Sequence, residues 1–190
     1  MSLTITFELD DADIEHFLAM AREAQDAIHS SGMSPDKVAA GVRELFAQAH
    51  KTKLPDYVSS RLTKLETLVN MVDDDEWKLP DEDLERVLSA IAYFANPEDL
   101  IPDRVPGIGF LDDAIMAELV VDSLDGEITS YEEFCDFRSA EEKRRENQGL
   151  DPNVGREDWL ADQRAVLHNR MRKRRAERAA SSPIGRIRLF

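Results

Sequence analysis

The feature that most constrains this sequence is a dense cluster of prolines and glycines near the middle of the chain. Pro97, Pro102 and Pro106 interrupt the chain there, followed by Gly107 and Gly109. Proline disfavours helical geometry in the residue before it, and glycine permits close backbone approach. Apolar residues with helical spacing lie on both sides of the cluster. The pattern predicts two helices that reverse direction through a stiff loop held against a core.

Helix start signals recur along the rest of the chain. Asp10 has the character of an N-cap, and Ser34 followed by Pro35 is a clear start signal. Pro55 and Pro80 each precede a segment in which apolar residues recur every three or four positions. Further helices are expected at residues 111–123, 130–145 and 156–179. The fold class is therefore predicted as all-α, a single helical domain of six to seven helices.

Two of these helices carry more specific expectations. Asp125 and Gly126 are expected to form a turn, after which Thr129 or Ser130 caps the helix at 130–145. The helix that opens at Pro80 is expected to turn one apolar face inward. That face comprises Leu84, Val87, Leu88, Ile91, Ala92 and Phe94.

Charge is distributed unevenly over the 190 residues, whose net charge is −15. From Arg138 onward, fourteen Lys and Arg stand against eight Asp and Glu, whereas the preceding residues hold ten basic residues against thirty-one acidic ones. Such asymmetry indicates a basic segment that binds either an acidic partner or the acidic remainder of the same protein. We expect a helical domain at 1–148, a linker at 149–155, a projecting basic helix at 156–180 and a flexible tail at 181–190.

Residues 93–113 follow one specific spacing, Y-x-x-x-P-x-D-L-I-P-D-x-x-P-x-x-G-x-x-D-D. Over about Leu84 to Leu124 the chain resembles the YkvA-like family, a domain of unknown function. The resemblance implies a fold element more than an activity. Many members look membrane-associated, whereas the apolar segments here are short and interrupted by charge, so we expect no transmembrane segment. The structural residues of the motif are expected to be Asn96, Pro97, Pro102, Pro106, Gly107 and Gly109.

Four aspartates of the motif form a candidate metal site. Asp99, Asp103, Asp112 and Asp113 would converge if the loop folds back, and carboxylates without nearby His or Cys suit Mg²⁺, Mn²⁺ or Ca²⁺. Metal-assisted phosphoryl-transfer or hydrolytic chemistry would follow from such a site. The alternative, which we favour, is structural, because aspartates accept backbone N–H bonds in turns and suit the positive end of a helix. No catalytic residue and no organic cofactor is predicted.

The basic C-terminal helix is a second candidate site. In one interpretation, its basic residues bind a partner protein or an anionic surface. In the other, the helix docks on the protein's own acidic surface. Nucleic-acid binding is disfavoured because an acidic body repels phosphate, and the thin apolar face argues against firm membrane insertion. The possible partner-binding residues are Arg170, Arg172, Lys173, Arg174 and Arg175.

Together these features predict a non-enzymatic, cytoplasmic interaction or scaffold protein. The motif is scaffold-like and carries no recognisable catalytic constellation, and the single cysteine, Cys135, cannot form an internal disulfide. The first alternative is a divalent-metal-dependent enzyme built on the four aspartates. The second is peripheral membrane association through the basic helix.

Overall fold

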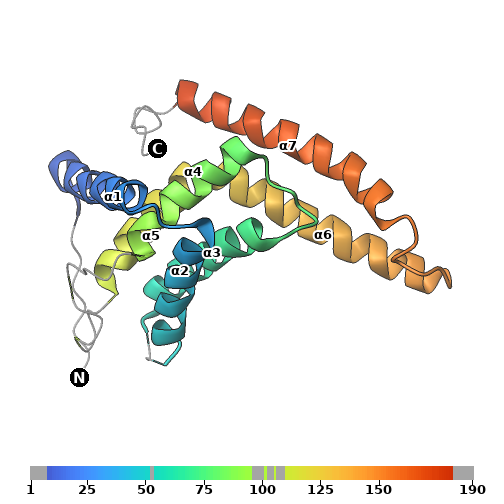
Figure 1. The fold of residues 1–190 in the computed structure, drawn as a ribbon, viewed down its shortest axis with the longest axis horizontal. Coiled ribbons are helices and arrows are strands. Elements are labelled where there is room, and N and C mark those ends of the chain that lie inside the picture. Colours follow the sequence, from blue (N-terminus) through green and yellow to red (C-terminus); the bar gives the residue numbers. More distant parts are fainter. Residues whose placement is uncertain (1–7, 52–53, 96–100, 102–104, 106–109, 182–190) are drawn as a thin grey trace.

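The computed structural model of the chain describes residues 8–51, 54–95, 101, 105 and 110–181. Within these residues the chain forms α-helices and one 3-10 turn, and no strand (Figure 1). The elements are α1 (Asp11–Ser31), α2 (Pro35–Ala49), α3 (Asp56–Asp73), α4 (Asp81–Ile91), η1 (Ala92–Ala95), α5 (Leu111–Ser123), α6 (Asp125–Asn147) and α7 (Arg156–Ser181). The prediction of an all-α single domain is confirmed.

The helix starts follow from the residues that precede them. Oδ1 of Asp10 accepts hydrogen bonds from the backbone N–H groups of Ala12 and Asp13, at 2.8 and 3.0 Å, and so satisfies donors in the first turn of α1. Ser34 is the N-cap residue of α2, while Pro55 and Pro80 occupy the same position before α3 and α4. A proline costs little there because it precedes the intrahelical hydrogen bonds. These starts lie where the sequence predicts them.

Helix α5 forms the centre of the domain. Seven of its thirteen residues are buried, and it packs against α3 and α6. The consecutive residues Ala114, Ile115, Met116 and Ala117 are all buried, as expected for a helix that other helices surround.

Close packing of α2 on η1 depends on a glycine. A Cβ atom at Gly41 would lie 3.0 Å from both Cα and Cβ of Ala95, a separation that would force one of the two backbones to move. Beside this contact, the rings of Tyr93 and Phe94 enter the core with their centroids 5.3 Å apart. Gly41 therefore sets the position of the 3-10 turn that follows α4.

Helix α6 begins earlier than expected, and the predicted turn at Asp125 and Gly126 with a cap at Thr129 or Ser130 is wrong. Gly126 lies inside the first turn of α6, where a Cβ atom would be 3.2 Å from Cβ of Arg174 on α7. The hydroxyl of Ser130 donates to the Gly126 carbonyl within the helix at 2.7 Å. The glycine serves helix packing rather than a turn.

Helix α7 lies along α6, so the prediction of a projecting helix is wrong (Figure 1). Leu160, Leu167 and Met171 have no exposed surface. Their separations of seven and four positions place them on one side of the helix. Burial of this stripe removes apolar area from water, which favours the docked arrangement over a free helix.

The turn between α3 and α4 fastens the α6–α7 hairpin to the rest of the domain. Trp77 is fully buried, with its ring 5.0 Å from that of Phe134 on α6 and 4.3 Å from that of His168 on α7. Next to it, Nη2 of Arg156 donates to Oε2 of Glu76 at 2.8 Å. This hydrogen bond is the main reason that the pKa of Glu76 lies below its usual value.

Candidate functional site

The predicted motif region covers most of α4, η1 and α5. Phe110 precedes α5 in the left-handed region, with φ 66°, and its side chain is almost completely buried. A bulky residue rarely adopts this backbone, so the buried ring must help to hold it there. The structural motif residues Asn96, Pro97, Pro102, Pro106, Gly107 and Gly109 lie outside the described part of the chain.

The first turn of α5 holds two buried aspartates. Asp112 is 1% exposed, and its Oδ2 accepts a hydrogen bond from the backbone N–H of Ile101 at 2.9 Å. Asp113 is also buried. Both carboxylates lie at the positive end of the helix dipole, which stabilises negative charge. Asp112 therefore holds the backbone of Ile101 against the start of α5.

Only two of the four aspartates of the predicted metal site, Asp112 and Asp113, lie among the residues that the structure describes. Asp99 and Asp103 lie outside the described residues, so whether they converge on Asp112 and Asp113 stays a prediction. Oδ1 of Asp112 is buried and accepts no hydrogen bond from the part of the chain that the structure describes. Among the described residues, no three His, Cys, Asp or Glu side chains form a group that could hold a metal ion.

A second acidic pair lies at the junction of α4, α6 and α7. Asp83 and Glu127 are 2% and 1% exposed. Nη1 of Arg175 donates to Oδ1 of Asp83 at 2.6 Å and lies 3.4 Å from Oε1 of Glu127, which Nε of Arg86 approaches to 3.3 Å. We call these four side chains the buried ion cluster. Nothing in the sequence interpretation identified it.

The cluster shifts the proton affinities of its members. Burial raises the pKa of Glu127, and the positive charges of Arg86 and Arg175 oppose that rise only in part. Burial also disfavours the charged form of Arg175, but the hydrogen bond and charge of Asp83 outweigh it and raise the pKa of this guanidinium. The cluster thus combines the Arg175–Asp83 ion pair with Glu127, whose charged form is disfavoured by burial.

Two of the predicted partner-binding residues contact the protein's own surface. Arg170 and Arg174 both pair with Glu133 of α6, at 2.5 and 2.6 Å. The hydrogen bond from Arg174 is the largest cause of a lowered pKa at Glu133. The acidic surface of α6 thus receives part of the basic face of α7.

The other three predicted residues differ in their surroundings. Arg175 belongs to the buried ion cluster, and Arg172 donates to Oδ1 of Asn169 at 2.9 Å. Lys173 has the most exposed side chain of the five and lies 3.7 Å from Glu177 on the next turn. Binding of an external partner by the five residues stays a prediction.

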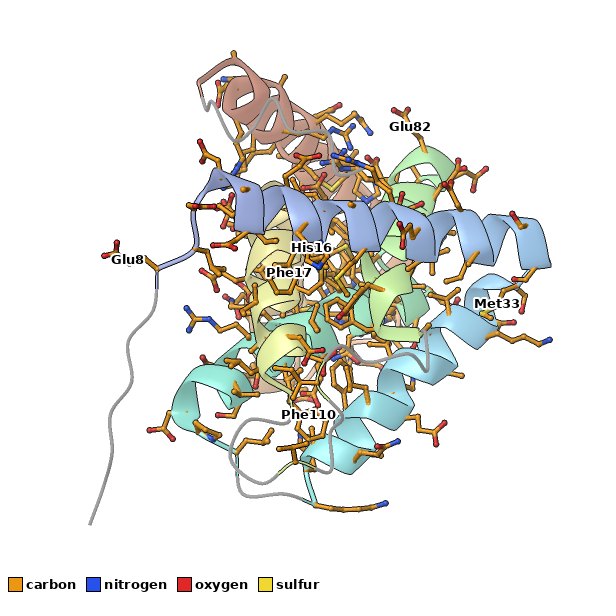
Figure 2. The ribbon with its side chains drawn as sticks, turned by 90° about the vertical axis from the view of Figure 1, so that its left-hand side faces the viewer. Glu8, His16, Phe17, Met33, Glu82 and Phe110 are labelled. Atoms are coloured by element: carbon orange, nitrogen blue, oxygen red, sulfur yellow. The ribbon has the colours of Figure 1, made fainter. Side chains whose placement is uncertain are left out.

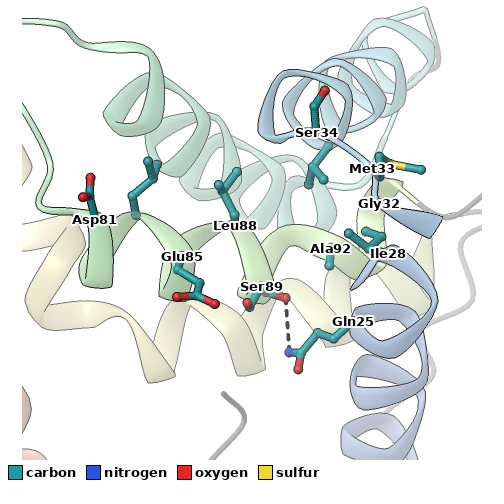
Figure 3. Close-up of a pocket in the computed structure, with 12 residues that line it drawn as sticks. Gln25, Ile28, Gly32, Met33, Ser34, Asp81, Glu85, Leu88, Ser89 and Ala92 are labelled. Carbon is teal, nitrogen blue, oxygen red and sulfur yellow. Dashed lines mark hydrogen bonds between the residues drawn. The ribbon is translucent and has the colours of Figure 1, made fainter. Parts of the chain in front are cut away.

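A groove opens where the end of α1, the start of α2 and one side of α4 meet (Figure 3). Its volume is about 590 Å³. Nε2 of Gln25 donates to the Ser89 carbonyl at 3.2 Å and links α1 to α4 across it. Asp81 and Glu85 add two exposed carboxyl groups from α4. The apolar lining comprises Ile28, Met33, Val38, Leu84, Leu88 and Ala92.

The prediction that the whole apolar face of α4 points inward is wrong in part. Val87 and Ile91 are fully buried, as expected, but Leu84 and Leu88 are only partly buried and line the groove. The chain turns from α1 into α2 near Met33, which lies at the end of α1 opposite Glu8 (Figure 2). This corner leaves one side of α4 open to solvent.

Comparison with known proteins gives two matches to the motif region. Residues 86–119 match a family described as a protein of unknown function, DUF1232. Over 96 residues the chain is 27% identical to the uncharacterized membrane protein YkvA of Bacillus subtilis (strain 168), an alignment that covers 50% of this chain and 88% of that protein. The chain carries a YkvA-like domain. The resemblance predicted from the motif spacing is confirmed, and no solved structure matches significantly.

The YkvA-like segment contributes to three of the features described above. It supplies Arg86 of the buried ion cluster, Leu88 on the wall of the groove and Asp112 at the start of α5. Helices α1 and α2 complete the groove from outside residues 86–119, and α6 and α7 complete the buried ion cluster. No helix among the described residues is long and apolar enough to cross a membrane.

Proposed function

We propose that this YkvA-like protein is a non-enzymatic interaction module that binds a basic amphipathic helix of a partner protein in the α1–α2–α4 groove. The observation that carries the proposal is the apolar lining of that groove beside two exposed carboxylates. Leu84 and Leu88, one helical turn apart on α4, offer apolar surface to side chains of an incoming helix. An amphipathic helix commonly docks in this way, through anchors three or four positions apart.

Charge determines the kind of helix that fits. Asp81 and Glu85 stand on the α4 side of the groove, and residues 1–137 as a whole contain three acidic residues for each basic one. A positive partner is therefore attracted over a long range and oriented as it arrives, whereas an acidic partner is repelled. The charge around the groove therefore favours a basic helix as the partner.

The test uses a labelled synthetic helix of about 14 residues, roughly 20 Å long, built from Leu and Lys in amphipathic order. Fluorescence anisotropy should detect binding to the protein, and a Leu and Glu peptide of the same pattern should not bind. Binding should weaken as salt is added, because the attraction between exposed charges is screened. Absence of binding by the Leu and Lys peptide at low salt would refute the proposal.

Two matched pairs of variants locate the site. Leu88→Arg should weaken binding at least about tenfold, which corresponds to about 1.4 kcal/mol. Val166→Arg introduces the same charge on an exposed position of α7 and should leave binding unchanged. Circular dichroism would verify that both variants fold. Equal binding by the two folded variants would place the peptide elsewhere.

The second pair removes charge without altering the apolar lining. Asp81→Asn with Glu85→Gln should weaken binding and reduce its salt dependence. Glu146→Gln with Asp162→Asn removes the same charge from exposed positions of the α6–α7 hairpin and should have little effect. Equal losses in the two double variants would mean that net charge, rather than the groove, attracts the peptide.

The buried Oδ1 of Asp112 favours a second candidate, a divalent-metal-dependent enzyme that uses Asp99, Asp103, Asp112 and Asp113. Titration calorimetry with Mg²⁺, Mn²⁺ and Ca²⁺ should then give binding heat and raise the melting temperature, because a ligand bound by the folded state stabilises it. Asp112→Asn should abolish both effects. The absence of heat and of a thermal shift would eliminate this candidate.

A cytoplasmic location, with peripheral membrane contact through α7 as an alternative, completes the proposal. Arg170 and Arg174 are engaged by Glu133, so membrane contact through them would have to compete with internal ion pairs. Flotation with vesicles that contain anionic lipid tests the alternative. If replacement of Arg170, Arg172 and Lys173 by Gln, in a variant that circular dichroism shows to be folded, leaves flotation unchanged, membrane contact through this helix is excluded.

A further inference from the structure

A buried histidine lies where α7 meets the turn between α3 and α4. His168 is 9% exposed, and its ring stands edge-on to that of Trp77, with the two centroids 4.3 Å apart. Its Nε2 atom makes no hydrogen bond with the part of the chain that the structure describes. Protonation would turn this nitrogen into a buried donor without an acceptor, which is costly. The docked position of α7 therefore favours the neutral imidazole.

The charged groups beside His168 on α7 and α4 also oppose its protonation. Arg164 and Arg172 lie four positions before and after it, on the same side of α7. The nearby anion on α4 is Asp83, but Nη1 of Arg175 already donates to this carboxylate at 2.6 Å. A proton on the imidazole would therefore add a third positive charge to one side of the helix.

The turn and α6 supply further titratable groups near the imidazole. In the turn, the Glu76 carboxylate is paired with arginines, and the Lys78 ammonium lies 2.7 Å from the Glu157 carboxylate. On α6, Glu127 lies between two guanidinium groups, and burial raises the pKa of Tyr131, so that its hydroxyl stays neutral. Each of these carboxylates already has a cation, so none is left to compensate a charged imidazole.

These surroundings lower the pKa of His168 from its usual 6.5. Burial is the largest cause and the positive charge of Arg172 adds to it, whereas Asp83 opposes the shift. A released α7 would expose the imidazole to water, so the released form binds the proton more tightly than the docked form. The contribution of the neutral ring to docking is therefore complete above about pH 6.5 and is lost as pH falls from there through the folded pKa.

The position of α7 in the fold suits release of this one helix. Figure 1 shows α7 along the outside of α6, and the buried stripe of Leu160, Leu167 and Met171 holds it there. His168 directly follows Leu167 and so lies near the middle of the stripe. Opening of a peripheral helix costs less free energy than unfolding of the whole domain.

We infer that His168 is a pH-sensitive latch, in which protonation of the imidazole releases α7 from the turn between α3 and α4. The latch is independent of the α1–α2–α4 groove and of the peptides that test it. At neutral pH the neutral ring packs on Trp77 and the apolar stripe of α7 stays buried. Acidification frees a helix that combines this stripe with the seven basic residues and one acidic residue of positions 164–178.

The test is amide hydrogen exchange of the full chain, followed by mass spectrometry at about pH 7 and about pH 5.5. After correction for the intrinsic pH dependence of exchange, α7 should exchange about two- to eightfold faster at the lower pH, the range expected when the folded pKa lies half a unit or more below the unfolded one. The slowest amides of α7 should also be less protected than those of α5. An unchanged rate in α7, or equal protection of α7 and α5, would overturn the inference.

Two neutral replacements remove the latch. His168→Phe keeps a ring against Trp77, and His168→Gln is a second neutral variant of different shape; circular dichroism would verify the fold of each. Both should lose the pH response of α7. His16→Gln replaces an exposed histidine of α1 and should keep that response. A response that persists in a folded neutral variant of His168, or that disappears in His16→Gln, would contradict the latch.

Glu127 titrates with the opposite sign and so provides a further control. Burial raises its pKa, and acidification therefore strengthens the docked state through this carboxyl group. Glu127→Gln removes this opposing titration, so the acceleration of α7 exchange between the two pH values should be at least as large as in the original chain. A smaller acceleration would assign the pH response to Glu127 and overturn the role of His168.

Discussion

Nη1 of Arg175 donates a hydrogen bond of 2.6 Å to Oδ1 of Asp83 and so joins α7 to α4 across 92 positions of the sequence. Asp83 is 2% exposed, and the same guanidinium lies 3.4 Å from the buried Glu127. Without Arg175, the cations that remain near these two buried carboxylates among the described residues are Arg86 and the more distant Arg172. The docking of α7 therefore depends on compensation of charge as well as on apolar contact.

Arg175→Met should lower the free energy of unfolding by about 3 kcal/mol, because it leaves Asp83 buried without its closest cation. Urea unfolding followed by circular dichroism measures the change. Lys173→Met is the control: this exposed neighbour should change stability by less than about 0.5 kcal/mol. Asp83→Leu combined with Arg175→Met should recover much of the loss, since no buried charge then remains unpaired.

Glu127 should make the protein less stable as pH rises. Its folded pKa is raised above the usual 4.5 by burial, so the folded state binds this proton more tightly than the unfolded state. The stabilisation is complete below the unfolded pKa and is lost as pH rises from about 4.5 through the folded pKa. Glu127→Gln lacks this titration. Its stability relative to the original chain should therefore increase between about pH 4 and pH 7 in urea unfolding. A constant difference would contradict the raised pKa.

The starts of α1 to α4 were predictable because their causes are local. The Asp10 side chain accepts hydrogen bonds within the first turn of α1. Ser34 and Pro35 mark the start of α2 as its N-cap and first residue, with Ser34 in an extended backbone conformation. The Pro55 and Pro80 starts have the same character. Such signals operate within one helical turn and need no knowledge of the rest of the fold.

The groove and the buried ion cluster were not predictable in this way. Leu88 belongs to the apolar stripe of α4, and only the position of the α1–α2 corner leaves it partly uncovered. Asp83 has the first-turn position of an ordinary solvent-exposed acid, yet α7 covers it. A weak signal was available: Asp83, Val87 and Ala90 lie three or four positions apart, on the face that is buried. The charge asymmetry along the chain did indicate that an acidic body could receive the basic helix.

Gly41→Ala should destabilise the protein by about 1–3 kcal/mol, the usual cost of overpacking. The added Cβ would lie 3.0 Å from Cα and Cβ of Ala95, and α2 would have to move away from η1. Alanine favours a helix over glycine by about 1 kcal/mol, so this gain reduces the observed loss. Ala95→Gly in the same chain removes one of the two close contacts and should recover part of the stability. A stabilised Gly41→Ala variant would show that the two elements separate easily.

Asp112→Ala should lower the free energy of unfolding by about 1–3 kcal/mol, because it removes the acceptor of the Ile101 N–H in a nearly inaccessible place. Asp112→Asn keeps an oxygen acceptor and should cost less, with the difference between the two variants reporting the hydrogen bond. Asp11→Ala is the matched control, since Asp11 occupies the first turn of α1 but is exposed, and its loss should cost less than about 1 kcal/mol.

If Asp112→Asn is as destabilising as Asp112→Ala, the negative charge rather than the hydrogen bond holds the loop. The contribution of the helix dipole would then be the dominant one, because both variants remove the charge and only one removes the acceptor. Unfolding measured at low and high salt distinguishes these cases further. A hydrogen bond at a site that is 1% exposed changes little with added salt, whereas a long-range attraction to solvent-exposed groups weakens. The anchoring role of Asp112 therefore predicts a loss in Asp112→Ala that is nearly independent of salt.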